Sequence, residues 1–116
     1  MQLHEVVDAR IQVHLVMELC EGKNLYHMIK KSREQKWPGL PEDQVRPIFA
    51  QIASAIAYMH SVSVVHRDVK LDNILVNQKG EIKLIDFGFA TKCSINEKLA
   101  ANCGTPQYMD PDLARK

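Results

Sequence analysis

The sequence lacks the marks of an extracellular or membrane-spanning protein. It has only three cysteines, Cys20, Cys93 and Cys103, without the paired short spacings of a disulfide framework or a zinc site. No segment approaches the roughly 18 uninterrupted apolar residues of a membrane span, and no basic region with an apolar run follows Met1. We therefore expect reduced thiols, no membrane span and an intracellular, cytoplasmic protein.

The chain also lacks a strong excess of charge of either sign. Its 15 Lys and Arg against 14 Asp and Glu leave a formal net charge of +1. This balance gives no broad attraction to nucleic acid or anionic membranes. With 116 residues, of which 46% are hydrophobic, the chain has material for one folded core and is too short for two ordinary domains.

The first third of the sequence predicts a hairpin followed by a short helix. Residues 3–7 and 11–19 are rich in Val, Ile and Leu on either side of a polar break at 8–10, which is typical of two antiparallel strands. A short helix is expected over 24–31. Residues 32–39 are polar, basic and interrupted by Pro and Gly, which favours a surface loop.

The middle of the sequence predicts a long amphipathic helix. Pro41 suits the first helical position, and the pattern ends near His60. One face is apolar at three- and four-residue steps and is expected to be buried; its members are Val45, Ile48, Ile52, Ile56 and Met59. Short strands are expected over 62–65, 74–76 and 82–85, and the chain beyond Phe87 is expected to be irregular.

Three motifs follow one another in the second half of the chain. Residues 66–73 read His-Arg-Asp-Val-Lys-Leu-Asp-Asn, residues 86–88 read Asp-Phe-Gly, and residues 104–108 read Gly-Thr-Pro-Gln-Tyr. Each residue alone is most often a solvated or turn residue, as short motifs give many false matches. Together, in this order and between predicted strands, they resemble the catalytic loop, the metal-binding loop and the start of the substrate-docking segment of eukaryotic protein kinases.

The resemblance implies phosphoryl transfer from ATP with Mg²⁺. By resemblance, Asp68 accepts or orients the proton of the substrate hydroxyl, and Lys70 pairs with the moving phosphoryl group. Asn73 and Asp86 are the implied oxygen ligands of Mg²⁺. Gly88 is expected to let the backbone turn beneath the metal.

The resemblance also implies supporting residues and a nucleotide pocket. His66 and Phe87 are expected to stack on each other as structural supports. The strand over 13–19 and the segment after it resemble the hinge that binds adenine. The residues implied to hold the nucleotide are Met17 as gatekeeper, Glu18 and Cys20 through their backbone, Asn24 near the ribose and Leu75 beneath the base.

Substrate class is indicated by two residues of these motifs. Lys70 and Thr105 favour a protein substrate that carries Ser or Thr, since tyrosine kinases typically lack this lysine. Small-molecule phosphotransferases share the two aspartates and the asparagine, and they remain an alternative class. The subfamily stays open among calcium/calmodulin-kinase-like, SNF1-like and NEK-like kinases, as does the oligomeric state.

The resemblance predicts an α+β, protein-kinase-like fold that is only partial. Residues 1–19 correspond to the last strands of the N-lobe, 20–24 to the hinge and 25–116 to part of the C-lobe. The first glycine is Gly22 and the first lysine is Lys23, so these 116 residues hold no glycine-rich loop or ATP-anchoring lysine before the hinge. Two interpretations follow, a truncated Ser/Thr kinase or a non-catalytic kinase-like fragment, and we expect residues 1–116 alone to show no turnover.

Two positions depart from the family pattern near the end of the chain. Arg67 often pairs with a phosphothreonine in related kinases, but Ala101 stands at that position. Arg67 is expected to pair instead with an acid such as Glu97, or with phosphate on Ser94 or Thr91. Asp110 replaces a small apolar residue, a change that is costly if the carboxylate is buried without a partner.

Overall fold

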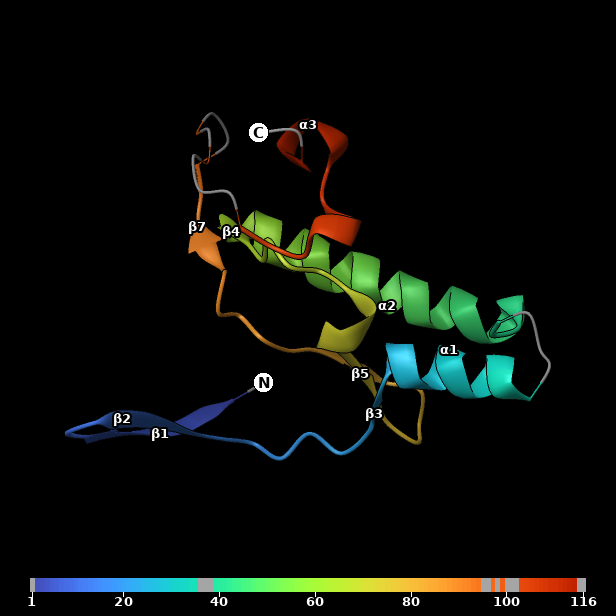
Figure 1. Cartoon of the computed structure of the whole chain (residues 1–116), viewed down its shortest axis with the longest axis horizontal. Coiled ribbons are helices and arrows are strands. Elements are labelled where there is room, and N and C mark those ends of the chain that lie inside the picture. Colours follow the sequence, from blue (N-terminus) through green and yellow to red (C-terminus); the bar gives the residue numbers. More distant parts are fainter. Residues whose placement is uncertain (1, 36–38, 95–96, 98, 100–102, 115–116) are drawn as a thin grey trace.

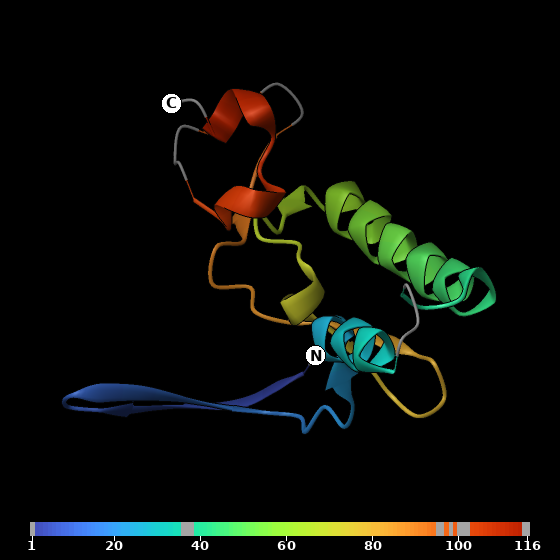
Figure 2. The same cartoon turned by 45° about the vertical axis from the view of Figure 1, so that its right-hand side comes forward.

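The computed structural model describes residues 2–35, 39–94, 97, 99 and 103–114. A two-stranded hairpin projects from a body made of helices and short strands, as both views show (Figures 1 and 2). The described elements mix helices with antiparallel strands. The α+β class predicted from the sequence is confirmed.

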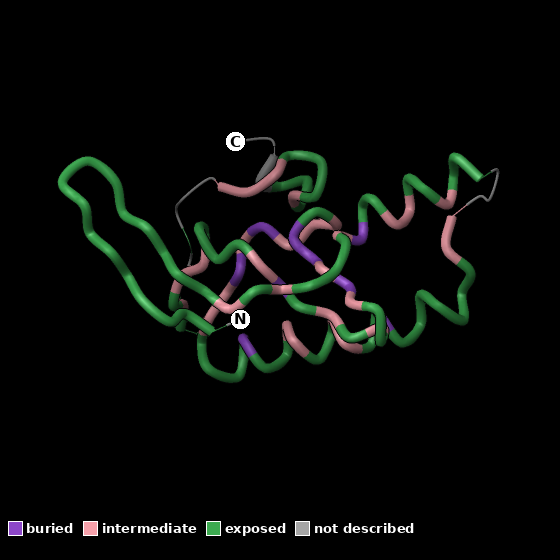
Figure 3. Tube along the Cα trace, turned by 90° about the horizontal axis from the view of Figure 1, so that it is seen from below, coloured by how far each residue is buried: buried purple, intermediate pink, exposed green. Residues whose placement is uncertain are grey.

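The hairpin consists of β1 (Leu3–Ala9) and β2 (Gln12–Met17), paired antiparallel from Leu3↔Met17 to Ala9↔Gln12. The two predicted strands are therefore present, with the turn shifted to Arg10 and Ile11. Both strands are exposed along their whole length (Figure 3). Their Val and Leu side chains therefore have little packing within this chain beyond the partner strand.

The first helix, α1 (Leu25–Glu34), begins where the sequence places a cap. The Asn24 side-chain oxygen accepts a hydrogen bond from the backbone N–H of His27 at 2.8 Å, which satisfies a donor of the first turn. The helix continues through residues 32–34, so the predicted loop begins too early. Ser, Arg and Glu are compatible with a helix, and the Pro and Gly that would end it come only at 38 and 39.

The long helix α2 (Glu42–Ser61) follows Pro41, as predicted, and supplies one wall of the core. Ile48 and Met59 are buried, and Ile52 and Ile56 are half-buried against them. Val45 is 39% exposed, so its predicted burial is wrong. It lies beside an apolar pocket of about 380 Å³. The remaining buried apolar residues of the core are Leu25, Ile74, Val76 and Leu84.

Among the described residues, five short strands complete the body. β5 (Ile74–Val76) lies between β3 (Lys23–Asn24) and β6 (Ile82–Leu84). β4 (Val64–Val65) pairs with β7 (Thr91–Lys92). The sequence did not predict strand β7. Two short 3₁₀ turns cover Leu71–Asn73 and Pro106–Tyr108, and the last helix is α3 (Pro111–Ala114).

Helix α2 holds the turn between β5 and β6 through one side chain. The Gln51 amide nitrogen donates to the Gly80 carbonyl at 2.8 Å, and the Ile82 N–H donates to the Gln51 side-chain oxygen at 3.1 Å. These bonds fix the two strands against the core. As a result, the loops that precede β5 and follow β6 emerge close together.

Candidate active site

His66 anchors the loop that joins β4 to β5. It is only 2% exposed, and its Nδ1 accepts a hydrogen bond from the Asp68 N–H at 3.3 Å. Its Nε2 therefore carries the proton and donates to the Ile85 carbonyl at 3.1 Å. The ring also packs against Phe87, with ring centroids 4.9 Å apart and ring planes tilted by 60°, so the predicted contact is present but the rings are not stacked face to face. His66 thus connects the loop of Asp68 to the loop of Asp86.

Asp68 is the centre of a hydrogen-bond network. Its Oδ1 accepts from the backbone N–H of Thr105 at 2.9 Å and from the Thr105 hydroxyl at 2.7 Å. Its Oδ2 lies 2.8 Å from the Lys70 ammonium and 3.2 Å from the Asn73 amide nitrogen. Lys70 also donates to the Thr105 hydroxyl oxygen at 2.9 Å. Two motifs that lie far apart in the sequence therefore meet at one carboxylate.

The network decides the charge state of Asp68. Burial by itself raises the pKa of the Asp68 carboxyl, but hydrogen bonds from Lys70 and Thr105 outweigh it and hold the pKa below its ordinary value. The same hydrogen bond to Asp68 raises the pKa of the Lys70 ammonium. Both groups are therefore charged at neutral pH.

Asn73 lies beside the strand that leads to Asp86. Its amide nitrogen donates to the Asp68 carbonyl at 3.0 Å, and the Ile85 N–H donates to the Asn73 carbonyl at 2.9 Å. Asp86 follows directly and has φ of 61°, a left-handed conformation uncommon outside glycine. The chain also turns at Gly88, as predicted, since the Ala90 N–H donates to the Phe87 carbonyl at 2.9 Å. Gly88 donates its N–H to Asp86 Oδ1 at 3.2 Å.

Gly104 brings the Thr105 segment against the catalytic loop. Its φ is +111°, and a Cβ at this position would lie 2.6 Å from the Arg67 carbonyl oxygen. Only glycine fits such an approach without a backbone shift. The next residue, Thr105, makes the two hydrogen bonds to Asp68.

The predicted nucleotide residues fall into two groups. Cys20 and Leu75 line one cavity of about 820 Å³, which lies between the hinge segment and the β5–β6 hairpin. Met17, Glu18 and Asn24 do not line it. Met17 ends β2, and Asn24 caps α1.

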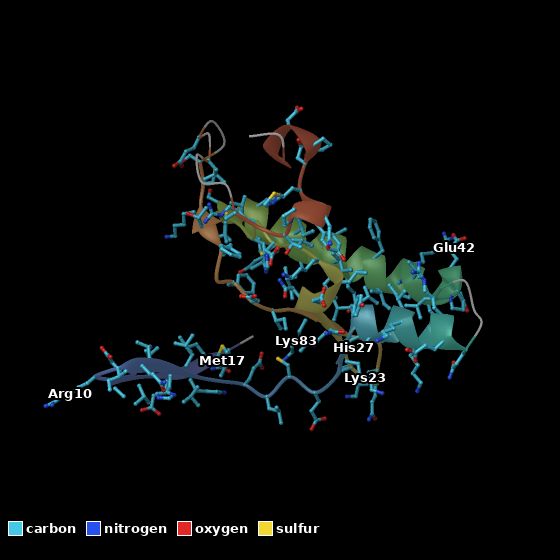
Figure 4. The ribbon with its side chains drawn as sticks, in the orientation of Figure 1. Arg10, Met17, Lys23, His27, Glu42 and Lys83 are labelled. Atoms are coloured by element: carbon cyan, nitrogen blue, oxygen red, sulfur yellow. The ribbon has the colours of Figure 1, made fainter. Side chains whose placement is uncertain are left out.

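Glu18 is instead joined to β6. Its Oε1 lies 2.9 Å from the Lys83 ammonium and accepts from the Gln2 N–H at 3.0 Å. The hydrogen bond from Lys83 is the largest cause that lowers the pKa of Glu18 to about 2. This ion pair links the base of the hairpin to the strand that precedes Asp86, and Figure 4 shows Lys83 near the hairpin end marked by Met17.

Near the end of the chain, one sequence expectation is corrected and the condition attached to another is not met. The predicted pair of Arg67 with Glu97 is absent from the described residues, since Arg67 Nε donates to the Phe89 carbonyl at 2.6 Å and Glu97 accepts from the Ser94 N–H. Asp110 is exposed, and its side chain accepts from the Asp112 N–H at 2.8 Å. The cost expected for a buried carboxylate at this position does not arise.

Sequence reasoning missed Thr105 as a direct partner of Asp68, and it missed Lys83 entirely. The Gly-Thr-Pro motif is the signal that could have identified Thr105, whereas nothing in the pattern marks Lys83. Among the described helices, none is long and apolar enough to cross a membrane. The described residues also contain no cluster of three or more His, Cys, Asp or Glu side chains that could hold a metal.

Comparison with known protein families agrees with this geometry. The family model for the protein kinase domain matches residues 1–116. The chain belongs to the protein kinase family. Sperm motility kinase 2B of Mus musculus is 41% identical over 111 residues, which cover 96% of this chain and 22% of that protein.

A second relative belongs to a differently named group of kinases. The SNF-related serine/threonine-protein kinase of Rattus norvegicus is 40% identical over 113 residues, covering 97% of this chain and 15% of that protein. The chain thus spans about a fifth or less of the length of these curated relatives. Their similar identities leave the subfamily undecided.

Proposed function

We propose that this protein, in its longest expressed form, transfers the γ-phosphoryl group of ATP to Ser or Thr hydroxyls of proteins. The observation that carries this proposal is the convergence of Lys70, Asn73 and Thr105 on the buried Asp68. Phosphoryl transfer depends on positioning and on neutralising charge, and this network supplies a fixed carboxylate beside an ammonium group.

In the proposed step, the substrate hydroxyl oxygen forms a bond to the γ-phosphorus while the bond to the β-phosphate oxygen breaks. ADP leaves, and the hydroxyl proton passes to Asp68. Because the pKa of Asp68 is lowered, the carboxylate is a weak base that mainly orients the hydroxyl until the proton becomes acidic late in the step. Lys70 is placed to balance the charge of the transferred group.

Asn73 and Asp86 fit the requirements of Mg²⁺. This ion binds through one or two carboxylates together with substrate phosphates, so a larger cluster of acidic residues is not needed. Bound Mg²⁺ would neutralise phosphate charge. The Asn73 nitrogen is engaged by Asp68, which fixes the orientation of the amide, and the exposed Asp86 carboxylate accepts a backbone bond from Gly88 through one oxygen.

We assign the adenine to the hinge segment. The cavity shared by Cys20 and Leu75 supports this assignment. Met17, Glu18 and Asn24 do not line this cavity, so their nucleotide roles rest on the resemblance alone. Serine or threonine specificity is supported by Lys70 and by the name of the SNF-related serine/threonine-protein kinase of Rattus norvegicus.

A second candidate function is a kinase-like binding protein without turnover. It is favoured by one observation: the Asp68 side chain is only 2% exposed. A substrate hydroxyl reaches this carboxylate only if a contact with Thr105 or Lys70 lengthens. Catalysis therefore requires a small opening of the network, whereas a binding role does not.

Nucleotide binding tests the metal assignment. We expect Asp86→Asn to reduce the Mg²⁺-dependent gain in ATP affinity at least about tenfold, as loss of a metal-site residue commonly does. Asp72→Asn is the matched control, since Asp72 is an exposed carboxylate of the same loop region. An unchanged metal dependence in Asp86→Asn, measured by calorimetry with and without Mg²⁺, would sink the assignment.

A further inference from the structure

A pocket of about 470 Å³ lies between α1 and the start of α2, outside the Asp68 network. Its apolar lining comes from Met28 and Leu40, which are half-buried, and from Pro41. Two amide side chains, Gln35 and Gln44, also line it. The pocket lining therefore combines apolar side chains with neutral hydrogen-bonding groups.

Every charged or titratable residue that lines this pocket is basic. These residues are Lys23, His27 and Lys31, all exposed. His27 and Lys31 are four residues apart in α1, so they lie on one face of the helix, and Lys23 directly precedes the cap residue Asn24. Figure 4 shows Lys23 and His27 on the same side of α1.

No carboxylate among the described residues neutralises this basic face. Neither Lys23 nor Lys31 takes part in an ion pair within the described part of the chain. Glu42 lies at the far side of the helix pair in Figure 4 and is paired with Arg46 at 2.6 Å. His27 is held in place because its Nδ1 lies 2.6 Å from the Asn24 side-chain oxygen. The pocket thus presents two exposed lysine ammonium groups and an imidazole ring whose position is fixed by Asn24.

We propose that this pocket binds an extended acidic segment of a partner protein, with carboxylates at alternate positions. The helical rise of about 1.5 Å per residue separates His27 and Lys31 by roughly 6 Å along α1. In an extended chain, side chains two residues apart lie on one side at a spacing of about 6.6 Å. Alternate carboxylates therefore match the basic positions, and Met28 and Leu40 contact the aliphatic atoms of the segment.

Fluorescence anisotropy with the full 116-residue chain tests this site. The probe is a labelled short peptide in which Asp alternates with Ser, and it is compared with a peptide of the same composition whose Asp residues are consecutive. We expect the alternating peptide to bind more tightly. Because the charges are exposed, Lys31→Gln should weaken its binding about two- to fivefold, and Lys23→Gln with Lys31→Gln about tenfold.

Lys30→Gln is the matched control, because Lys30 is an exposed lysine of the same helix that does not line the pocket. It should leave the affinity within about twofold. Equal losses in Lys30→Gln and Lys31→Gln, equal affinity for the two peptides, or no binding would each overturn the proposal. All three positions are exposed, and circular dichroism checks that the variants keep their fold. The readout needs no ATP, so it is independent of the proposed catalytic function.

Discussion

Replacing Gly104 with alanine should separate the two motifs that meet at Asp68. At φ of +111° an L-residue is strained by about 1–2 kcal/mol. The added Cβ would also lie 2.6 Å from the Arg67 carbonyl oxygen, and such overpacking costs about 1–3 kcal/mol. We therefore expect Gly104→Ala to lower the free energy of unfolding by about 2–5 kcal/mol.

Gly80→Ala provides a control for the backbone strain alone. Gly80 has φ of +78°, and a Cβ there would meet nothing within 4 Å. This variant should lose only about 1–2 kcal/mol. Urea unfolding followed by circular dichroism gives both values, and the difference between them isolates the close approach at Arg67.

Hydrogen exchange at the Thr105 N–H tests whether Gly104→Ala also weakens the hydrogen bond from this N–H to Asp68. If the strained chain moves away from Arg67, the bond from this N–H to Asp68 lengthens and exchange becomes faster. Suppose that Gly104→Ala unfolds within about 0.5 kcal/mol of Gly80→Ala and that exchange at Thr105 is unchanged. The proposed dependence of the network on Gly104 would then be wrong.

Two further predictions concern the charged groups. Thr105→Val removes a hydroxyl donor and should raise the pKa of Asp68, whereas Thr105→Ser keeps the hydroxyl and should not raise it. NMR titration of the Asp68 carboxyl carbon measures both pKa values. Equal pKa values in the two variants would contradict the prediction. The pKa of Glu18 is lowered from 4.5 to about 2, so its pairing stabilises the fold fully above pH 4.5, and this contribution is lost as the pH falls toward 2. Lys83→Met should remove most of this loss, and urea midpoints with the same acid dependence as the unchanged chain would count against the ion pair.

Local patterns in the sequence were enough to predict most elements. The three- and four-residue spacing of apolar residues located α2, and two runs rich in Val, Ile and Leu on either side of a polar break located the hairpin. The predictions failed where burial or strand formation depends on a neighbouring element. Val45 shares the apolar spacing of Ile48 but faces an apolar pocket, and β7 is a two-residue strand that exists only because it pairs with β4.

For the site too, local motifs carried the predictions, and contacts between distant segments were missed. The resemblance to kinase motifs predicted Asp68, Lys70, Asn73 and Asp86 as site residues, because these residues lie within short segments of fixed order. Contacts between distant segments left no comparable signal. The bond from Thr105 to Asp68 joins positions 37 residues apart, and the pairing of Glu18 with Lys83 depends on how the hairpin base meets β6.

The most direct test of the account is phosphate transfer by the longest expressed form of the protein, measured with γ-labelled ATP and a peptide that carries Ser and Thr. Asp68→Asn should reduce the rate at least about a hundredfold, the lower range for loss of a positioned proton acceptor. Asp72→Asn should leave it within about twofold. Transfer by Asp68→Asn at the rate of the unchanged protein would contradict the central role given to Asp68.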